Sequence, residues 1–255
     1  MRNIWTISRK EMKSYFASPI AYLLLAMFAV IFGFFFWNAV GYFVNMSLQS
    51  QAMGRSFPMN INEMIVRPLL MNVSVIGLFL IPMITMRLFA EEKRQGTVEL
   101  LLTSPVRDWE IILGKWLAAV MLYATMLGIA ALNFAFLFAY GKPDLKPVLA
   151  GFLGLLLQAG ALLAIGTFIS TLTKNQIIAG GATFGACLLL WVFEWVAGYE
   201  TAAWAKVMSY MSVVNHLDPF AKGVIDSKDA VYYITLAFLG LFLTARSLES
   251  LRWRA

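Results

Sequence analysis

The sequence predicts an all-α, polytopic membrane protein: a single transmembrane domain, residues 1–255, that crosses the bilayer six times. Two observations lead to this prediction. First, 60% of the residues are hydrophobic and 13% are charged, whereas soluble domains carry about 25% charged residues. Second, the chain contains runs with at most one charged residue, each near the length of about 20 apolar residues that a helix needs to cross the hydrocarbon core. Helices satisfy their own backbone hydrogen bonds in lipid, so each run is expected to be helical.

Six runs meet this length criterion. They are residues 19–44, 68–86, 111–140, 147–172, 176–197 and 230–245. The last is the shortest, so flanking side chains are expected to reach the interfaces. An even number of crossings places both termini on one side. That side carries thirteen of the 20 Lys and Arg residues, and positively charged loops are retained in the cytoplasm. We therefore expect both termini, and a loop over residues 87–110, to be cytoplasmic.

The composition also excludes several functions. Cys187 is the single cysteine and His216 the single histidine, so neither an internal disulfide nor a conventional protein-built metal site is expected. The net charge of +6 does not indicate nucleic-acid binding, because the basic residues flank apolar runs. No Gly-x4-Gly-Lys-Ser/Thr motif is present, so this chain is not expected to bind or hydrolyse ATP, and it contains no cofactor site.

Residues 1–17 read as an interfacial helix along the cytoplasmic leaflet. On a helical wheel its basic residues form one edge beside an apolar arc that contains Trp5 and Phe16. Glu11 falls inside that arc, so part of the apolar face is expected to contact protein rather than lipid. A generic membrane anchor is the alternative interpretation.

The loop over residues 87–110 contains helix boundary signals. Gly96 is predicted to end the helix that continues from the second span. Ser104 and Pro105 are predicted to begin the next helix, as its N-cap and first residue. Between them, residues 97–102 form a short amphipathic element that we expect at the membrane surface.

Three features lie toward the external side. Glu194 interrupts the fifth span, and it is interpreted either as a gate or as an interfacial carboxylate. His216 and Asp218, before Pro219, could contribute to a metal site, but hydrogen bonding that shapes the turn is favoured because no third ligand is in view. Gly181 and Gly185 form a Gly-x3-Gly pattern that packs helices closely, within this chain or against a second copy.

One segment is recognisable as a family motif. Residues 90–106 read AEEKRQGTVELLLTSPV and are followed by IILGK at 111–115, while RKE at 9–11 and YFASP at 15–19 open the chain. This pattern resembles the type-2 (ABC-2) exporter permeases over nearly the whole chain. Among them, the gliding-motility-associated permease subunits look most similar.

The resemblance implies a permease dimer or pseudo-dimer in the bacterial inner membrane, carried by two ABC ATP-binding subunits that hold ATP and Mg. The short cytoplasmic loop would dock into each ATPase as a coupling helix, and this chain itself would not be an enzyme. By similarity, the most coupling-sensitive residues are Glu91, Glu92, Gly96, Thr97 and Glu99, with Leu101 and Leu102 as apolar docking residues. Residues 199–229 would form an external, re-entrant gate that includes His216, Asp218 and Pro219, and Glu194 near the end of the preceding span is a further gate candidate.

Two alternatives remain open. The chain could belong to a surface-assembly or gliding machine with the same ATPase partner, and an extracytoplasmic partner could complete either complex. It could instead be a solitary channel or membrane enzyme that uses Glu194, His216 and Asp218. The permease and the surface-assembly or gliding machine both require an ATPase, whereas the solitary channel or enzyme does not. The transported substrate is not encoded in any motif.

Overall fold

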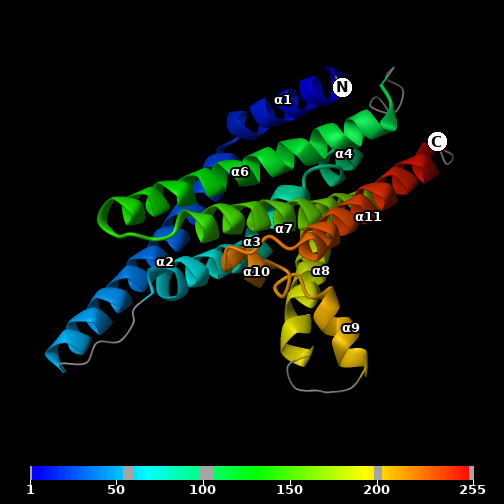
Figure 1. Cartoon of the computed structure of the whole chain (residues 1–255). Coiled ribbons are helices and arrows are strands. Elements are labelled where there is room, and N and C mark those ends of the chain that lie inside the picture. Colours follow the sequence, from blue (N-terminus) through cyan, green and yellow to red (C-terminus); the bar gives the residue numbers. More distant parts are fainter. Residues whose placement is uncertain (1, 54–59, 98–105, 198–202, 253–255) are drawn as a thin grey trace.

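A computed structural model describes residues 2–53, 60–97, 106–197 and 203–252, and these residues form helices and connecting loops without strands. The helices are α1 (Arg2–Ala17), α2 (Pro19–Ala52), η1 (Asn62–Val66), α3 (Arg67–Thr85), α4 (Ala90–Gln95), α6 (Asp108–Tyr140), α7 (Leu145–Leu172), α8 (Gln176–Ala197), α9 (Ala203–Met211), α10 (Leu217–Ala221) and α11 (Ser227–Arg252) (Figure 1). Six of them are long and apolar enough to cross a membrane. The predicted all-α class with six spans is confirmed.

Each predicted span corresponds to one long helix, but two helices are longer than expected. α2 continues to Ala52, past the expected end at residue 44. α11 has 26 residues instead of the 16 uncharged ones counted in the sequence. It begins at Ser227 because residues 227–229 supply a polar first turn, and it continues through the basic segment after residue 245. At 1.5 Å per residue, α11 is long enough to cross the hydrocarbon core without stretching.

The two central helices are α3 and α7. In the most apolar stretch of each span, 67% of the residues are buried in both, against 17–39% in the other four. α7 packs against α3, α6, α8, α10 and α11 and lies in the middle of the bundle (Figure 1). Small residues permit this close packing. A Cβ added to Gly240 of α11 would lie 2.7 Å from the carbonyl carbon of Ala164 in α7.

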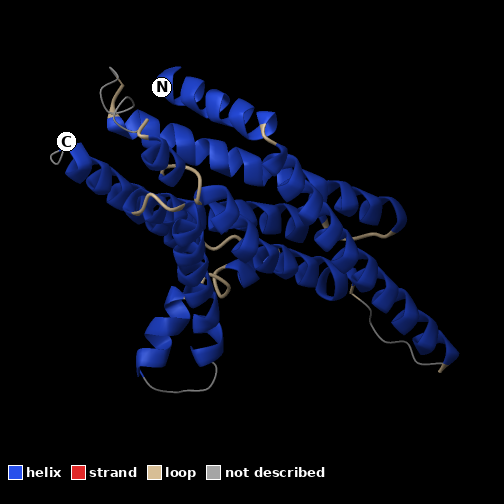
Figure 2. Ribbon diagram, turned by 180° about the vertical axis from the view of Figure 1, so that it is seen from behind, coloured by secondary structure: helices blue, strands red, loops and turns tan. Residues whose placement is uncertain are grey.

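The predicted amphipathic helix at the N-terminus is present as α1, and it lies lengthwise beside α6 (Figures 1 and 2). Its apolar side meets α6 at Gly114, where an added Cβ would lie 2.7 Å from Ile7. Its opposite side exposes Arg9, Lys10 and Lys13. The predicted protein contact of the apolar arc is therefore correct, while the position of α1 at the cytoplasmic leaflet stays a prediction.

The start of α6 corrects one prediction. Val106 and Arg107 are not helical, and α6 begins at Asp108 instead of Pro105. The reason is local: the Glu110 carboxylate accepts the Arg107 backbone N–H at 3.3 Å, which caps the helix at this point. Ser104 lies outside the described residues.

Beyond α8 the chain forms a helical hairpin and then returns to the bundle. α9 packs against α8, and the two project from the other helices (Figure 1). α10 then packs against α7 and α3, with Leu217, Phe220 and Ala221 buried. The segment between α8 and α11 thus folds back on the bundle. Its re-entry into the membrane stays a prediction.

Candidate functional site

Lys115 of α6 lies at the centre of a buried charge cluster that joins three helices. Its Nζ is 2.9 Å from Glu11 Oε1 of α1 and 2.8 Å from Glu92 Oε1 of α4, and its side chain is 3% exposed. The ammonium also lies 5.4 Å from the centre of the Phe89 ring, within cation–π range. A buried ammonium is tolerated only when it is paired, and here two carboxylates pair it. We call the end of the bundle that holds this cluster the α4 end.

The acidic residues of α4 both turn toward the protein. Glu91 accepts a hydrogen bond from Arg87 Nε at 2.9 Å, and Glu92 binds Lys115. The second Glu92 oxygen, Oε2, and Arg87 Nη1 are buried without a hydrogen-bond partner among the described residues. Nearby, burial and then the Glu11 carboxylate raise the pKa of the Tyr15 hydroxyl far above its usual value, so it stays neutral. Glu92 therefore ties α4 to α6, while Glu91 ties α4 to the preceding turn at Arg87.

α4 is also tied to α7 and, through it, to α11. The backbone N–H groups of Phe89 and Ala90 both donate to Ser170 Oγ at 3.1 Å. Lys93 donates to the Thr171 carbonyl, and Thr171 Oγ1 donates to Ser247 Oγ of α11 at 2.8 Å. A displacement of this short helix would strain its contacts to α6 and α7 directly, and its link to α1 through Lys115.

Gly96 ends a helix, as predicted, but that helix is the separate α4 and not a continuation of the second span, because residues 86–89 form turns after α3. The Gly96 φ of +71° lies in the left-handed region that side chains disfavour, and the Thr97 N–H donates to the Glu92 carbonyl at 3.0 Å. Arg94 and Gln95 beside it are exposed. Glu99, Leu101 and Leu102, and most of the predicted amphipathic element, lie outside the described residues.

At the opposite end, which we call the α10 end, Asp218 joins two helices by ion pairs. Arg67 Nη2 of α3 lies 2.6 Å from Asp218 Oδ1, and Lys222 Nζ lies 2.5 Å from Oδ2. Burial alone would raise the pKa of Asp218, but hydrogen bonds from Lys222 and Arg67 outweigh it and hold the pKa below its usual value. Asp218 is therefore ionised at neutral pH and fastens α10 to α3.

A cavity of about 480 Å³ opens beside this ion pair. It lies between α3, α8 and the segment that precedes α10. Its lining residues are Glu63, Arg67, Pro68, Met71, Ser74, Val75, Trp191, Glu194, Val214, Asn215 and Asp218. We call it the α10-end pocket. The structure thus brings Glu194 and Asp218 together, although they were predicted on separate grounds.

His216 has a different partner from the one the sequence indicated. Its Nδ1 lies 2.6 Å from Asp229 Oδ1 of α11, and its Nε2 lies 2.8 Å from the Tyr210 carbonyl. The ring stacks on Tyr232 at 3.9 Å. No group of three possible metal ligands occurs in the described parts of the chain. The favoured hydrogen-bonding role of His216 is what the geometry shows, and Asp229, a polar residue in the first turn of α11, is the partner that sequence reasoning missed.

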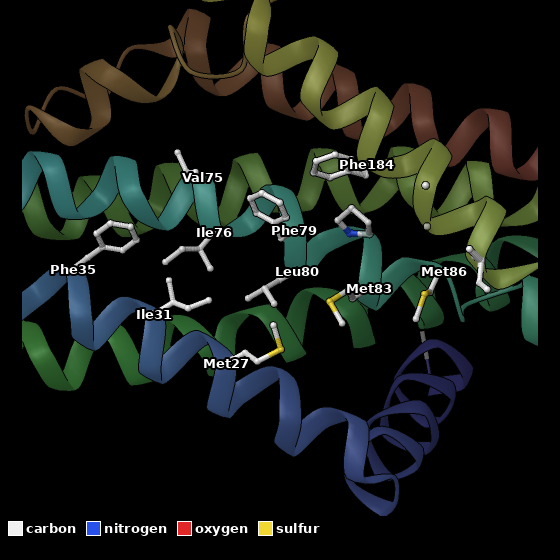
Figure 3. A pocket seen from close by; sticks show the side chains of 14 residues that line it. Met27, Ile31, Phe35, Val75, Ile76, Phe79, Leu80, Met83, Met86 and Phe184 are labelled. Carbon is white, nitrogen blue, oxygen red and sulfur yellow. The ribbon is translucent and has the colours of Figure 1, made fainter.

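An apolar groove of about 770 Å³ runs between α2, α3 and α8 (Figure 3). Met27 and Ile31 come from α2 and Phe184 from α8, and Figure 3 shows them around Phe79 and Leu80 of α3. On the α8 side, a Cβ added to Gly181 or Gly185 would meet nothing within 4 Å. The Gly-x3-Gly face is therefore not used for packing within the described chain.

Comparison with known proteins agrees with this architecture. The family described as ABC-2 family transporter protein matches residues 5–226, which span the chain from α1 to the loop before α11. The chain belongs to this family, and within it the chain is a multi-pass membrane protein. A comparison with curated proteins found no match. The likeness to gliding-motility subunits in particular stays a prediction.

Proposed function

We propose that this chain is the permease subunit of an ABC exporter, driven by separate ATP-binding subunits that hold ATP and Mg. The observation that carries the proposal is the family match together with the buried Lys115 cluster. Members of this family generally leave ATP hydrolysis to a separate subunit. The chain would lie in the bacterial inner membrane with both termini in the cytoplasm, because most Lys and Arg residues flank that side.

In this mechanism the α4 end faces the ATPase. The exposed residues Arg94 and Gln95, with the segment that follows Thr97, would contact the partner. Movement of the docked segment would pass through Glu92 and Lys115 to α1 and α6, and through Ser170 to α7. Glu91 and Glu92 would act as internal anchors, so their effect on coupling would be indirect.

The permease pathway would be completed by a second copy or a paralogue. The outer surface of α8 supports this, because only 17% of its most apolar stretch is buried within the chain, the least of the six spans. The uncovered Gly185, which does not line the apolar groove, permits a close helix contact there.

The same contacts distinguish between the alternative functions. A surface-assembly or gliding machine would use the same ATPase partner and the same α4 end, so it remains a second form of the proposal. A solitary membrane enzyme would need accessible reactive groups. His216 is 5% exposed and bonded through both ring nitrogens, and Asp218 is paired with two cations, which disfavours that function.

Site-specific photo-crosslinking in native membranes tests the proposal. A photoreactive residue in place of Arg94, at the exposed end of α4, is expected to capture an ATP-binding subunit. The same residue in place of Val224, which is 56% exposed next to α10, is the matched control and is expected to capture none. If a correctly inserted Arg94 variant forms no adduct with an ATP-binding subunit, the α4 end is not the coupling site.

A further inference from the structure

Glu194 occupies an electrostatically unfavourable position. It lines the α10-end pocket from α8, one helical turn beyond Trp191, and its carboxylate makes neither a hydrogen bond nor an ion pair with any residue the structure describes. The charged group that acts on the Glu194 carboxylate is the Asp218 carboxylate, which is also negative and therefore repels it. A partly buried carboxylate beside another carboxylate lacks the cation that such groups normally have.

The pocket as a whole has an excess of negative charge. Glu63, Glu194 and Asp218 contribute carboxylates to its wall, and Arg67 is the only cation among the described residues that line it. Arg67 is already committed to Asp218 through Nε and Nη2, at 2.8 and 2.6 Å. Lys222 also binds Asp218 but does not line the pocket. The free negative charge is therefore that of Glu63 and Glu194.

The pocket and the apolar groove adjoin, because Val75 of α3 lines both. The α3 helix lines the pocket with Arg67, Met71 and Ser74. Its next residue, Val75, lines both the pocket and the groove. The two spaces, about 480 and 770 Å³, therefore adjoin at the same turn of α3. One is polar and acidic, and the lining of the other consists of Met, Phe, Ile, Leu, Val, Pro and Gly (Figure 3).

We propose that these two spaces together bind a cationic amphipathic molecule, with its ammonium group in the α10-end pocket and its apolar chain along the groove. The ammonium would rest between the Glu194 carboxylate and the Trp191 indole, because carboxylates and aromatic rings both attract such cations. An anionic amphipath would be repelled by Glu63 and Glu194. A neutral one would gain the apolar contacts alone. The inference that such molecules are transported rests on the proposed function. The inference that they bind at this site can be tested without the ATPase.

The test uses the full chain alone, in nanodiscs of digalactosyldiacylglycerol, a neutral lipid without an ammonium group, with empty nanodiscs as baseline. Radiolabelled dodecyltrimethylammonium is the probe, and unlabelled dodecyl sulfate and dodecyl maltoside are competitors with the same chain. We expect saturable binding of the ammonium above baseline and weak competition by the other two. Glu194→Gln should weaken binding about tenfold or more, which is the size of effect expected for a lost charge contact in a partly buried site. Glu194→Asp should retain part of the affinity.

The matched control is Glu249→Gln, the same chemical change at an exposed residue of α11 that pairs with Arg246. It should leave binding unchanged. Equal competition by all three dodecyl compounds would show that the groove alone binds, and it would overturn the proposal. Full binding by a folded Glu194→Gln variant, or absence of saturable binding to the wild-type chain, would overturn it as well. Because no ATPase is present, these outcomes are independent of whether Arg94 crosslinks to one.

Discussion

Replacement of Lys115 by methionine is expected to destabilise the chain by about 3 kcal/mol and to abolish stimulation of the partner ATPase. The loss of the ammonium leaves Glu11 and Glu92 close together with no cation between them, and breaking a buried ion pair on one side costs about 3–5 kcal/mol. The lower value applies because both carboxylates keep about a fifth of their surface exposed. Thermal unfolding in nanodiscs and ATPase activity of the reconstituted complex measure the two effects.

Two further variants separate stability from coupling. Lys115→Arg keeps the positive charge and should retain most of both properties. The triple variant Glu11→Gln, Glu92→Gln, Lys115→Met removes the whole charge set, so it should recover much of the stability because no unpaired charge is left buried. It should not recover coupling if the charged contact transmits the motion of α4. Normal ATPase stimulation in the Lys115→Met complex would show that this contact plays no part.

Replacement of Gly240 by valine is expected to disrupt the packing of α11 on α7. A Cβ at this position would lie 2.7 Å from the Ala164 carbonyl carbon, 2.9 Å from its oxygen and 2.9 Å from the Ile165 nitrogen. These are backbone atoms of a central helix, which cannot turn aside as a side chain can. Overpacking of this kind costs about 1–3 kcal/mol, and the branched valine should reach the upper part of that range. Thermal unfolding and size-exclusion profiles in detergent report it.

The control for this prediction is Gly128→Ala in α6, where an added Cβ meets nothing within 4 Å. Alanine is the better helix former, so this variant should be neutral or slightly more stable. If Gly240→Val unfolds at the wild-type temperature while Gly128→Ala behaves as expected, α7 and α11 are not as closely packed as described.

The six spans could be predicted from the sequence because a lipid bilayer restricts what can cross it. Each span must supply a long apolar run and satisfy its own hydrogen bonds, so composition along the chain located all six. The predicted start of α6 was wrong because two capping signals compete there. Pro105 is a good first helical residue, but Glu110 caps the helix at Arg107 instead.

The site was predicted less completely because its contacts are distant in sequence. Glu11 stood out as a charge in an apolar arc and Lys115 ends the family segment IILGK, but nothing in the sequence indicated that these residues, 104 apart, form a pair. The same holds for His216 and Asp229, whose pairing depends on how α10 and α11 return to the bundle. The family motif indicated that Glu92 matters, while only the fold shows that it faces inward.

Purification from native membranes in mild detergent directly tests the claim that this chain is a permease driven by a separate ATPase. We expect the tagged chain to bring down a stoichiometric ATP-binding subunit with ATPase activity, and we expect a Glu99→Lys form, altered in the predicted coupling segment, to release it. Recovery of the intact chain alone, without an ATP-binding subunit or ATPase activity, would contradict the claim and favour a channel or membrane enzyme.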